Sequence, residues 1–179
     1  EREHLEPNHM KIELVDGCDV SRIPAGEILM EGISQEIPFT ARGLCRIDIK
    51  MATYNRVNRG VAMFELLDSS DTVIVSIPFA SDTVKDNQWR SFHFGPLPAI
   101  SGDRIRLRLR SQSNDPANAI TVWAEDTHPG SGYTVNGQSY HGSINYRLFC
   151  SDYSGSEARY KAGENSSSLK GKMKRWLTR

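Results

Sequence analysis

Four arginines recur at every second position of the segment 104–110, which reads RIRLRLR. They are Arg104, Arg106, Arg108 and Arg110. A guanidinium group presents a planar fork of N–H donors that matches carboxylates and phosphates, so this stripe has the chemistry to hold an acidic or phosphorylated glycan. The alternative is a solvated face whose arginines pair with acids on neighbouring strands, such as Asp48 and Glu65. The acidic balance of the body, described below, favours pairing.

Aromatic side chains are the second candidate group. Alternation along 89–94 places Trp89 on one strand face with His93 and opposite Phe92. The same rule puts Trp123 on the face opposite Val122. Both tryptophans are therefore predicted to point away from the core. The alternative is that each caps the core edge with its indole N–H hydrogen-bonded, as large aromatic side chains usually do.

A third group lies in a Gly-rich segment near the end of the chain and comprises Tyr133, Tyr140 and His141. Loops on a rigid scaffold often carry binding residues. Equally, the glycines and asparagines of this segment can serve turns alone. Both interpretations stay open at this point.

These side chains need strands to position them, and the sequence predicts many. Ile105, Leu107 and Leu109 share the face opposite the arginines, the pattern of an antiparallel strand with one wet side. The segment 119–125 alternates again after a turn-rich spacer, which suggests a hairpin-like pair with 104–110. Further strands are predicted at 12–15, 32–39, 44–51, 61–67, 72–79, 89–94, 133–135 and 144–150. This spacing, with Asn136-Gly137 as a hairpin turn, predicts an all-β antiparallel sandwich of the jelly-roll type.

The predicted organisation has four parts. Residues 1–31 form a leader with a possible first strand, 32–151 the β-sandwich module, 152–168 a Ser/Gly-rich linker and 169–179 a short basic amphipathic helix. The apolar residues Leu169, Met173 and Trp176 fall on one face of that helix. It has three interpretations: the first helix of a missing domain, which we favour, a docking element, or a contact with an anionic membrane surface.

The charge distribution and the cysteines limit the kinds of partner and the cell compartment that we expect for this chain. Residues 159–179 carry seven Lys/Arg and one acid, a balance of +6, and the formal net charge of the chain is zero, so residues 1–158 carry −6. An acidic body argues against nucleic acid as a partner. Cys18, Cys45 and Cys150 are odd in number and form no CxxC pair. Buried free thiols favour a reducing compartment, which predicts a cytoplasmic location, peripheral to the inner membrane if the basic tail contacts lipid.

Catalytic and metal motifs are absent from the sequence. It contains no GxSxG, P-loop, GxGxxG, HExxH or EF-hand pattern. We expect a non-enzymatic module without a cofactor, although it can belong to a multidomain glycosyltransferase. A structural Ca²⁺ is the one metal considered, with turn formation as the alternative role of the acid pairs. These pairs are Asp16 and Asp19, Asp68 and Asp71, and Glu125 and Asp126.

Several segments together carry a family resemblance: VAMFELLD, DNQWRSFHFGPLP, SGDRIRLRLRS, AITVWAED and INYRLFC. From Gly32 to Cys150 the chain resembles the jelly-roll, carbohydrate-binding-like modules joined to bacterial glycosyltransferases and other proteins of cell-surface polysaccharide synthesis, including O-antigen. The resemblance implies a non-catalytic module that recognises a polysaccharide or oligosaccharide beside an attached catalytic domain.

Under that resemblance, exposed aromatics stack on sugar rings and polar side chains bind hydroxyl groups. The expected stacking residues are Trp89, Trp123, Tyr133 and Tyr140. The expected hydrogen-bonding residues are Arg56, Arg106, Arg108 and His141. The alternative hypothesis is a structural or protein-interaction sandwich that forms a homodimer or packs on an attached enzyme domain, with Trp89 and Trp123 in the interface. A hydrolase of the jelly-roll type is the third hypothesis.

Overall fold

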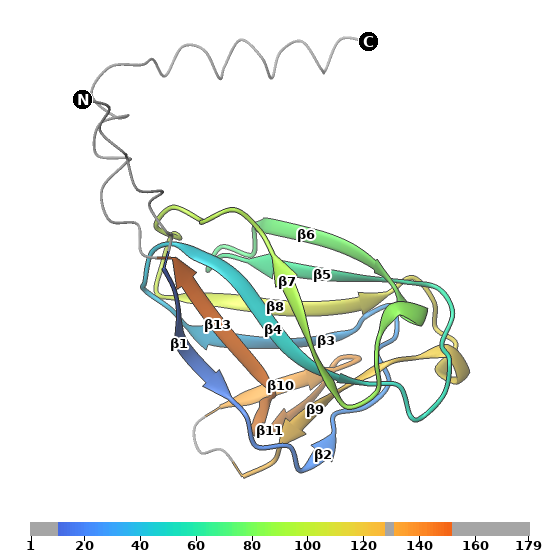
Figure 1. The fold of residues 1–179 in the computed structure, drawn as a ribbon. Coiled ribbons are helices and arrows are strands. Elements are labelled where there is room, and N and C mark those ends of the chain that lie inside the picture. The colour runs from blue at the N-terminus through green and yellow to red at the C-terminus, as the bar shows by residue number, and fades with distance from the viewer. Residues whose placement is uncertain (1–10, 128–130, 152–179) are drawn as a thin grey trace, which may run out of the picture.

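The computed structural model describes residues 11–127 and 131–151 (Figure 1). These residues form two antiparallel sheets packed face to face, which confirms the predicted all-β sandwich. The expected linker at 152–168 and basic helix at 169–179 lie outside the described residues. None of the helical turns in the described part is long and apolar enough to span a membrane.

One sheet has seven strands and the other six. The seven-stranded sheet contains β1 (Ile12–Cys18), β2 (Ile23–Pro24), β4 (Leu44–Ala52), β7 (Gln88–His93), β9 (Thr121–Glu125), β12 (Ser143–Ile144) and β13 (Tyr146–Ser151). The six-stranded sheet runs in the order β11 (Gln138–His141), β10 (Gly132–Val135), β3 (Ile33–Pro38), β8 (Arg104–Ser111), β5 (Val61–Leu67) and β6 (Val73–Ala80). Two 3-10 turns, η1 (Ser81–Thr83) and η2 (Pro116–Asn118), complete the described elements.

The core lies between the sheets and is built from the inward positions that alternation predicts. Ile105, Leu107 and Leu109 of β8 are each at most 1% exposed. Across the interface, Phe64 of β5 stacks on Phe92 of β7 with ring centroids 4.3 Å apart. Burying large side chains of this kind contributes about 1.5–3 kcal/mol each, so these contacts hold the two sheets together.

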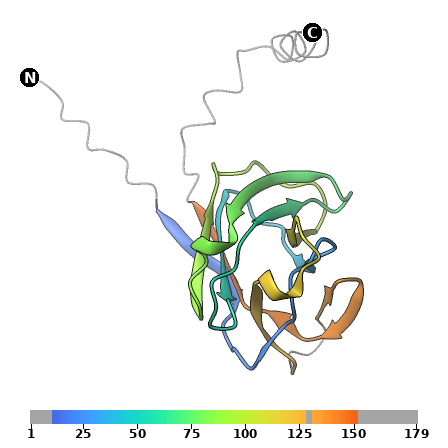
Figure 2. The same cartoon turned by 90° about the vertical axis from the view of Figure 1, so that its right-hand side faces the viewer.

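The turns follow their sequence signals. Asn136 and Gly137 have φ values of 47° and 83°, and they join β10 to β11 as a two-residue hairpin (orange in Figure 2). Asp16-Gly17, by contrast, is a residue pair common in turns but lies inside β1, which pairs with β13 along its length. The strand accommodates this pair through a bulge between Leu14 and Asp16.

One topological prediction is wrong. The segments 104–110 and 119–125 do not pair with each other: β8 lies between β3 and β5, whereas β9 pairs with β4, β2 and β12 in the other sheet. Alternation reports which side chains share a face and does not identify the neighbouring strand. The spacer containing η2 therefore crosses from one sheet to the other.

All three cysteines are buried free thiols. Burial is the largest influence on Cys45 and Cys150, and it raises the pKa of both thiols. They are therefore held in the protonated, weakly nucleophilic form.

Candidate functional site

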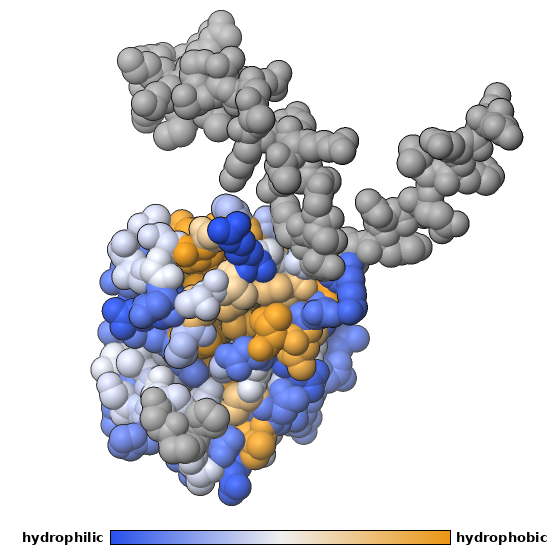
Figure 3. Space-filling view, turned by 90° about the vertical axis from the view of Figure 1, so that its left-hand side faces the viewer, coloured by the Kyte–Doolittle hydropathy of each residue, from blue (hydrophilic) through white to orange (hydrophobic). Residues whose placement is uncertain are grey.

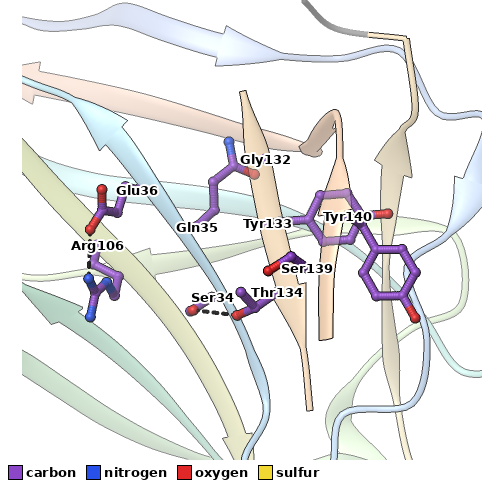
Figure 4. A pocket seen from close by; sticks show the side chains of 9 residues that line it. All are labelled: Ser34, Gln35, Glu36, Arg106, Gly132, Tyr133, Thr134, Ser139 and Tyr140. Carbon is purple, nitrogen blue, oxygen red and sulfur yellow. Dashed lines mark hydrogen bonds and ion pairs between the residues drawn. The ribbon is translucent and has the colours of Figure 1, made fainter. Parts of the chain in front are cut away.

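A groove opens on the solvent face of the six-stranded sheet, over β3, β8, β10 and β11 (Figure 4). Its volume is about 470 Å³, within the range of small-ligand sites. Its polar side chains come from outward positions, and Ser34 and Thr134 share a hydrogen bond of 2.8 Å across β3 and β10. The lining residues are Ser34, Gln35, Glu36, Arg106, Gly132, Tyr133, Thr134, Ser139 and Tyr140.

A second hollow of about 390 Å³ continues this groove and shares Glu36 and Gly132 with it. It extends past Pro38 and Asp103. The lining therefore follows β3 from Ser34 to Pro38, four residue steps, or about 14 Å at the rise of an antiparallel strand. We refer to the two hollows together as the β3 groove.

The groove is deep because a side chain is missing from its floor. The register of β10 on β3 brings Gly132 beside Glu36, and Gly132 lines both hollows. A Cβ atom at this position would approach the carbonyl oxygen of Tyr140 to 3.0 Å. The side chains of Ser34 and Ser139 are also small and fill little space above the sheet. The hollow therefore continues from Gly132 along the β10–β11 hairpin.

The charged wall of the groove consists of ion pairs. Glu36 lies directly opposite Arg106 in the ladder, receives a hydrogen bond of 2.6 Å from it, and is 3.2 Å from Arg104. Arg106 also contacts Asp71 at 2.7 Å. The hydrogen bond from Arg106 is the main reason that the pKa of Glu36 lies below its ordinary value, with both guanidinium charges contributing.

The rest of the arginine stripe is neutralised in the same way, through Glu65 of β5. Its carboxylate is 2.6 Å from Arg108 and 2.9 Å from Arg110. Burial acts to raise the pKa of Glu65, but the hydrogen bonds from both arginines outweigh it and leave the pKa lowered. Pairing with Glu65 is thus confirmed. Pairing with Asp48 is wrong, because Asp48 lies on β4 in the other sheet and pairs with Arg46 at 3.0 Å.

The two tyrosines of the hairpin occupy the side facing the core. Tyr133 pairs with Gln35 on β3 and is only 3% exposed. Its ring stacks on Tyr140 with centroids 5.6 Å apart, and Tyr140 is 39% exposed at the sheet edge. The ring of Tyr140 therefore lies on the core side of the hairpin, where Tyr133 supports it, while the hydroxyl groups of Ser34, Thr134 and Ser139 lie on the solvent side. His141 is exposed and pairs with Gly132 across the hairpin.

The two tryptophans lie on the other sheet. Trp89 of β7 is covered by the guanidinium of Arg147, 3.9 Å from the ring centroid, and Arg147 is itself held by Asp19 at 3.1 Å. Trp123 of β9 donates its indole N–H to Asn87 Oδ1 at 2.8 Å. This hydrogen bond is the arrangement expected of a tryptophan that caps the core edge.

Arg56 connects its own loop to a distant segment of the chain through hydrogen bonds. Its guanidinium donates to the carbonyl oxygens of Pro116 at 2.6 Å and Ala119 at 3.0 Å, which ties the loop after β4 to the crossing spacer. The predicted ligand-binding residues therefore fall into two groups, one at the groove and one away from it. Arg106, Tyr133 and Tyr140 line the groove, with His141 beside it and Arg108 on the same face. Trp89, Trp123 and Arg56 are elsewhere.

The sequence did not single out the outward polar residues Ser34, Glu36, Thr134 and Ser139 of the groove, nor Gln35 and Gly132, which also line it. A signal for the first two was available, because Ser34 and Glu36 alternate with Ile33 and Ile37 and so must face solvent. What was missing was the register that aligns them with β10.

Asp68, from one of the acid pairs considered for Ca²⁺, serves a turn. Asp68 Oδ1 accepts hydrogen bonds from the backbone N–H groups of Ser70 at 2.8 Å and Thr72 at 3.0 Å. Within residues 11–127 and 131–151, no group of three or more His, Cys, Asp or Glu side chains is placed to hold a metal ion.

Comparison with known proteins leaves the chain without a family. No family model and no curated protein matches it. Among solved structures, one match is the VP2 subviral particle of infectious bursal disease virus, with 12% identity, a TM-score of 0.22 and coverage of 99% of this chain. The aligned region is about half of the viral chain, 53%. At this level of similarity the match bears on neither the fold nor the function.

Proposed function

We propose that this protein is a non-catalytic carbohydrate-binding module that recognises a saccharide in polysaccharide biosynthesis or export. The observation that carries the proposal is the β3 groove. It combines hydroxyl groups from Ser34, Thr134 and Ser139 with the Glu36–Arg106 ion pair on one solvent-facing surface. The resemblance in sequence to modules of polysaccharide synthesis points to the same ligand class.

The chemistry of the groove suits a sugar. Each sugar hydroxyl both donates and accepts hydrogen bonds, and the groove offers acceptors on Glu36 together with donors on Arg106. A binding role of this kind needs no catalytic pair, and it fits a module attached to an enzyme domain. We place it in the cytoplasm beside the inner membrane, as the sequence analysis suggests.

The test is a glycan array followed by titration calorimetry with the full chain. Arg106→Gln removes a charged donor worth about 1.5–3 kcal/mol, so we expect affinity to fall about tenfold or more. The affinity of Ser139→Ala should fall by a smaller factor. The control is Ser91→Ala, at an exposed position on β7 in the other sheet, and its affinity should match that of the wild type. Absence of binding to every glycan would overturn the proposal. Loss of binding in Trp123→Ala with normal binding in Arg106→Gln would overturn the groove as the site.

A second candidate function, homodimerisation, is favoured by one observation on β1. Among the strands that the structure describes, β1 is at the edge of its sheet and pairs with β13 alone, and it exposes Ile12 (43%), Leu14 (56%) and Val15 (46%). Apolar side chains gather on the face that includes it (Figure 3). An exposed edge strand of this kind can pair with another strand.

The occupant that β1 fits best is a second copy of the same strand. Antiparallel pairing about a two-fold axis would bring the same edge of both copies together, so that their exposed apolar side chains share one surface. Sedimentation velocity over a hundredfold concentration range tests this idea. A monomer–dimer equilibrium that Leu14→Lys abolishes supports it, whereas a monomer at all concentrations overturns it.

A further inference from the structure

We infer that the β3 groove selects an uncharged stretch of a saccharide chain and discriminates against acidic sugars. This inference rests on the proposed function and adds the class of ligand. It reverses the first impression of the arginine stripe, whose residue types alone favour an anionic ligand. The argument depends on how those arginines are engaged in the folded protein.

Every arginine of the stripe already has a carboxylate partner. The carboxylate of Glu36 pairs with both Arg104, at 3.2 Å, and Arg106, at 2.6 Å. Arg108 and Arg110 are shared by Glu65, at 2.6 and 2.9 Å. An anionic ligand therefore has to compete with carboxylates of the protein itself. These carboxylates lose no translational or rotational entropy when they pair with the arginines, whereas a ligand does.

The stripe carries no excess of positive charge. Its four guanidinium groups on β8 stand against the carboxylates of Glu36, Glu65, Asp71 and Asp103, and Asp68 lies in a further hollow beside Glu36 and Arg106. Asp71 reaches Arg106 at 2.7 Å and Asp103 lines the second hollow, so the negative groups are spread along the groove. A surface without an excess of positive charge gives no electrostatic steering toward an acidic chain.

Glu36 adds a direct penalty against anions. It lines both hollows, and its pKa is held below the ordinary value by Arg106, so it is ionised at neutral pH. A uronate or phosphate placed in the groove would meet this carboxylate, and like charges at close range disfavour binding. A hydroxyl group in the same place instead donates a hydrogen bond to it.

The shape of the groove indicates which part of a chain it takes. The two hollows form an open trough along β3 over about 14 Å at the strand rise, and polar groups line both hollows. A trough of this form accommodates several consecutive sugar units. It therefore suits the interior of a neutral chain better than a single charged terminus.

The experiment uses the full chain and matched pairs of immobilised oligosaccharides, neutral hexose oligomers against the same oligomers containing uronate. Binding is measured at about 50 mM and about 500 mM NaCl, since salt screens interactions between charges. We expect the neutral member to bind at least tenfold more tightly, with little dependence on salt. Tighter binding of the uronate member, weakened by salt, would overturn the inference and leave the proposed function standing. Binding of neither member would overturn both.

A pair of variants isolates the cause. Glu36→Gln removes the repelling carboxylate and frees the donors of Arg104 and Arg106, so the preference should shift toward the uronate member by about tenfold. Asp82→Asn removes one negative charge in η1, away from the groove, and should leave the preference unchanged. An equal shift in both variants would mean that the overall charge of the protein, rather than the groove, sets the selectivity. That result would contradict the inference.

Discussion

Gln35 and Ser143 form a hydrogen bond of 2.9 Å that joins the two sheets through the core, from Gln35 Nε2 on β3 to Ser143 Oγ on β12. The same amide accepts a hydrogen bond of 2.8 Å from the backbone N–H of Ile144 through Oε1. Gln35 is 3% exposed and Ser143 1% exposed. A single buried side chain therefore sets how the groove-bearing sheet sits on its partner.

Replacing Gln35 with leucine should destabilise the protein markedly. The substitution leaves the buried N–H of Ile144 without its acceptor, and an unsatisfied buried group costs about 1–3 kcal/mol. With the loss of the bond to Ser143, we expect the free energy of unfolding to fall by about 2–4 kcal/mol, measured by urea denaturation. The control is Ser34→Ala on the outward face of the same strand, expected to cost under about 1 kcal/mol. Equal stability of the two variants would contradict the bridging role.

Acidification should expose the contribution of Glu65. Its folded-state pKa is lower than the ordinary value of 4.5, so the unfolded chain binds the proton more tightly. The stabilisation is therefore fully present above about pH 5 and is lost as the pH falls through the folded-state pKa. Denaturation of the wild type between pH 7 and 3 should show this decline.

The matched variant for that titration is Glu65→Gln, which should be about 2–3 kcal/mol less stable at pH 7 and show a flatter pH profile, because Arg108 and Arg110 lose the buried carboxylate that they share. Glu36→Gln should change both quantities much less, since Glu36 is 45% exposed and its pairs are screened by solvent. Parallel profiles for wild type and Glu65→Gln would refute the assignment.

Gly142 holds the turn between β11 and β12 and should not accept a side chain. Its φ is +103°, and a Cβ atom there would overlap the carbonyl oxygen of Glu125. Gly142→Ala should lower the melting temperature substantially and shift the β10–β11 hairpin that forms one wall of the groove. Gly95→Ala is the control, because its Cβ meets nothing within 4 Å and its φ is not positive. Similar melting temperatures for the two variants would count against this strain.

The residues that lie away from the groove should affect stability rather than binding. Trp89→Ala and Arg56→Ala should keep saccharide affinity within about twofold, because Arg147 covers the Trp89 ring and Arg56 is occupied by carbonyl oxygens. Arg56→Ala should cost about 1–3 kcal/mol of stability through those orphaned acceptors. Calorimetry and thermal unfolding of the same samples separate the two effects. A tenfold loss of affinity in Trp89→Ala would move the site to the other sheet.

The sequence alone determined the fold class and the inner and outer faces of most strands. Ile105, Leu107 and Leu109 are buried as alternation predicts, because a strand with a two-residue period can bury only one of its faces. The Asn136-Gly137 turn was also readable, since two consecutive positive φ angles favour these residue types. Such features depend on residues that are close together in the sequence, so a short stretch of sequence is enough to predict them.

Tertiary structure alone decided which strands are neighbours and hence where the candidate site lies. The alignment of Glu36 with Arg106, of Ser34 with Thr134, and of Gly132 beside them joins residues about 70 to 100 positions apart. Strand register and sheet order come from packing of the whole core, which no local pattern encodes. For the same reason, the arginine stripe that looks like an anion site in sequence becomes a row of ion pairs once Glu36 and Glu65 are placed against it.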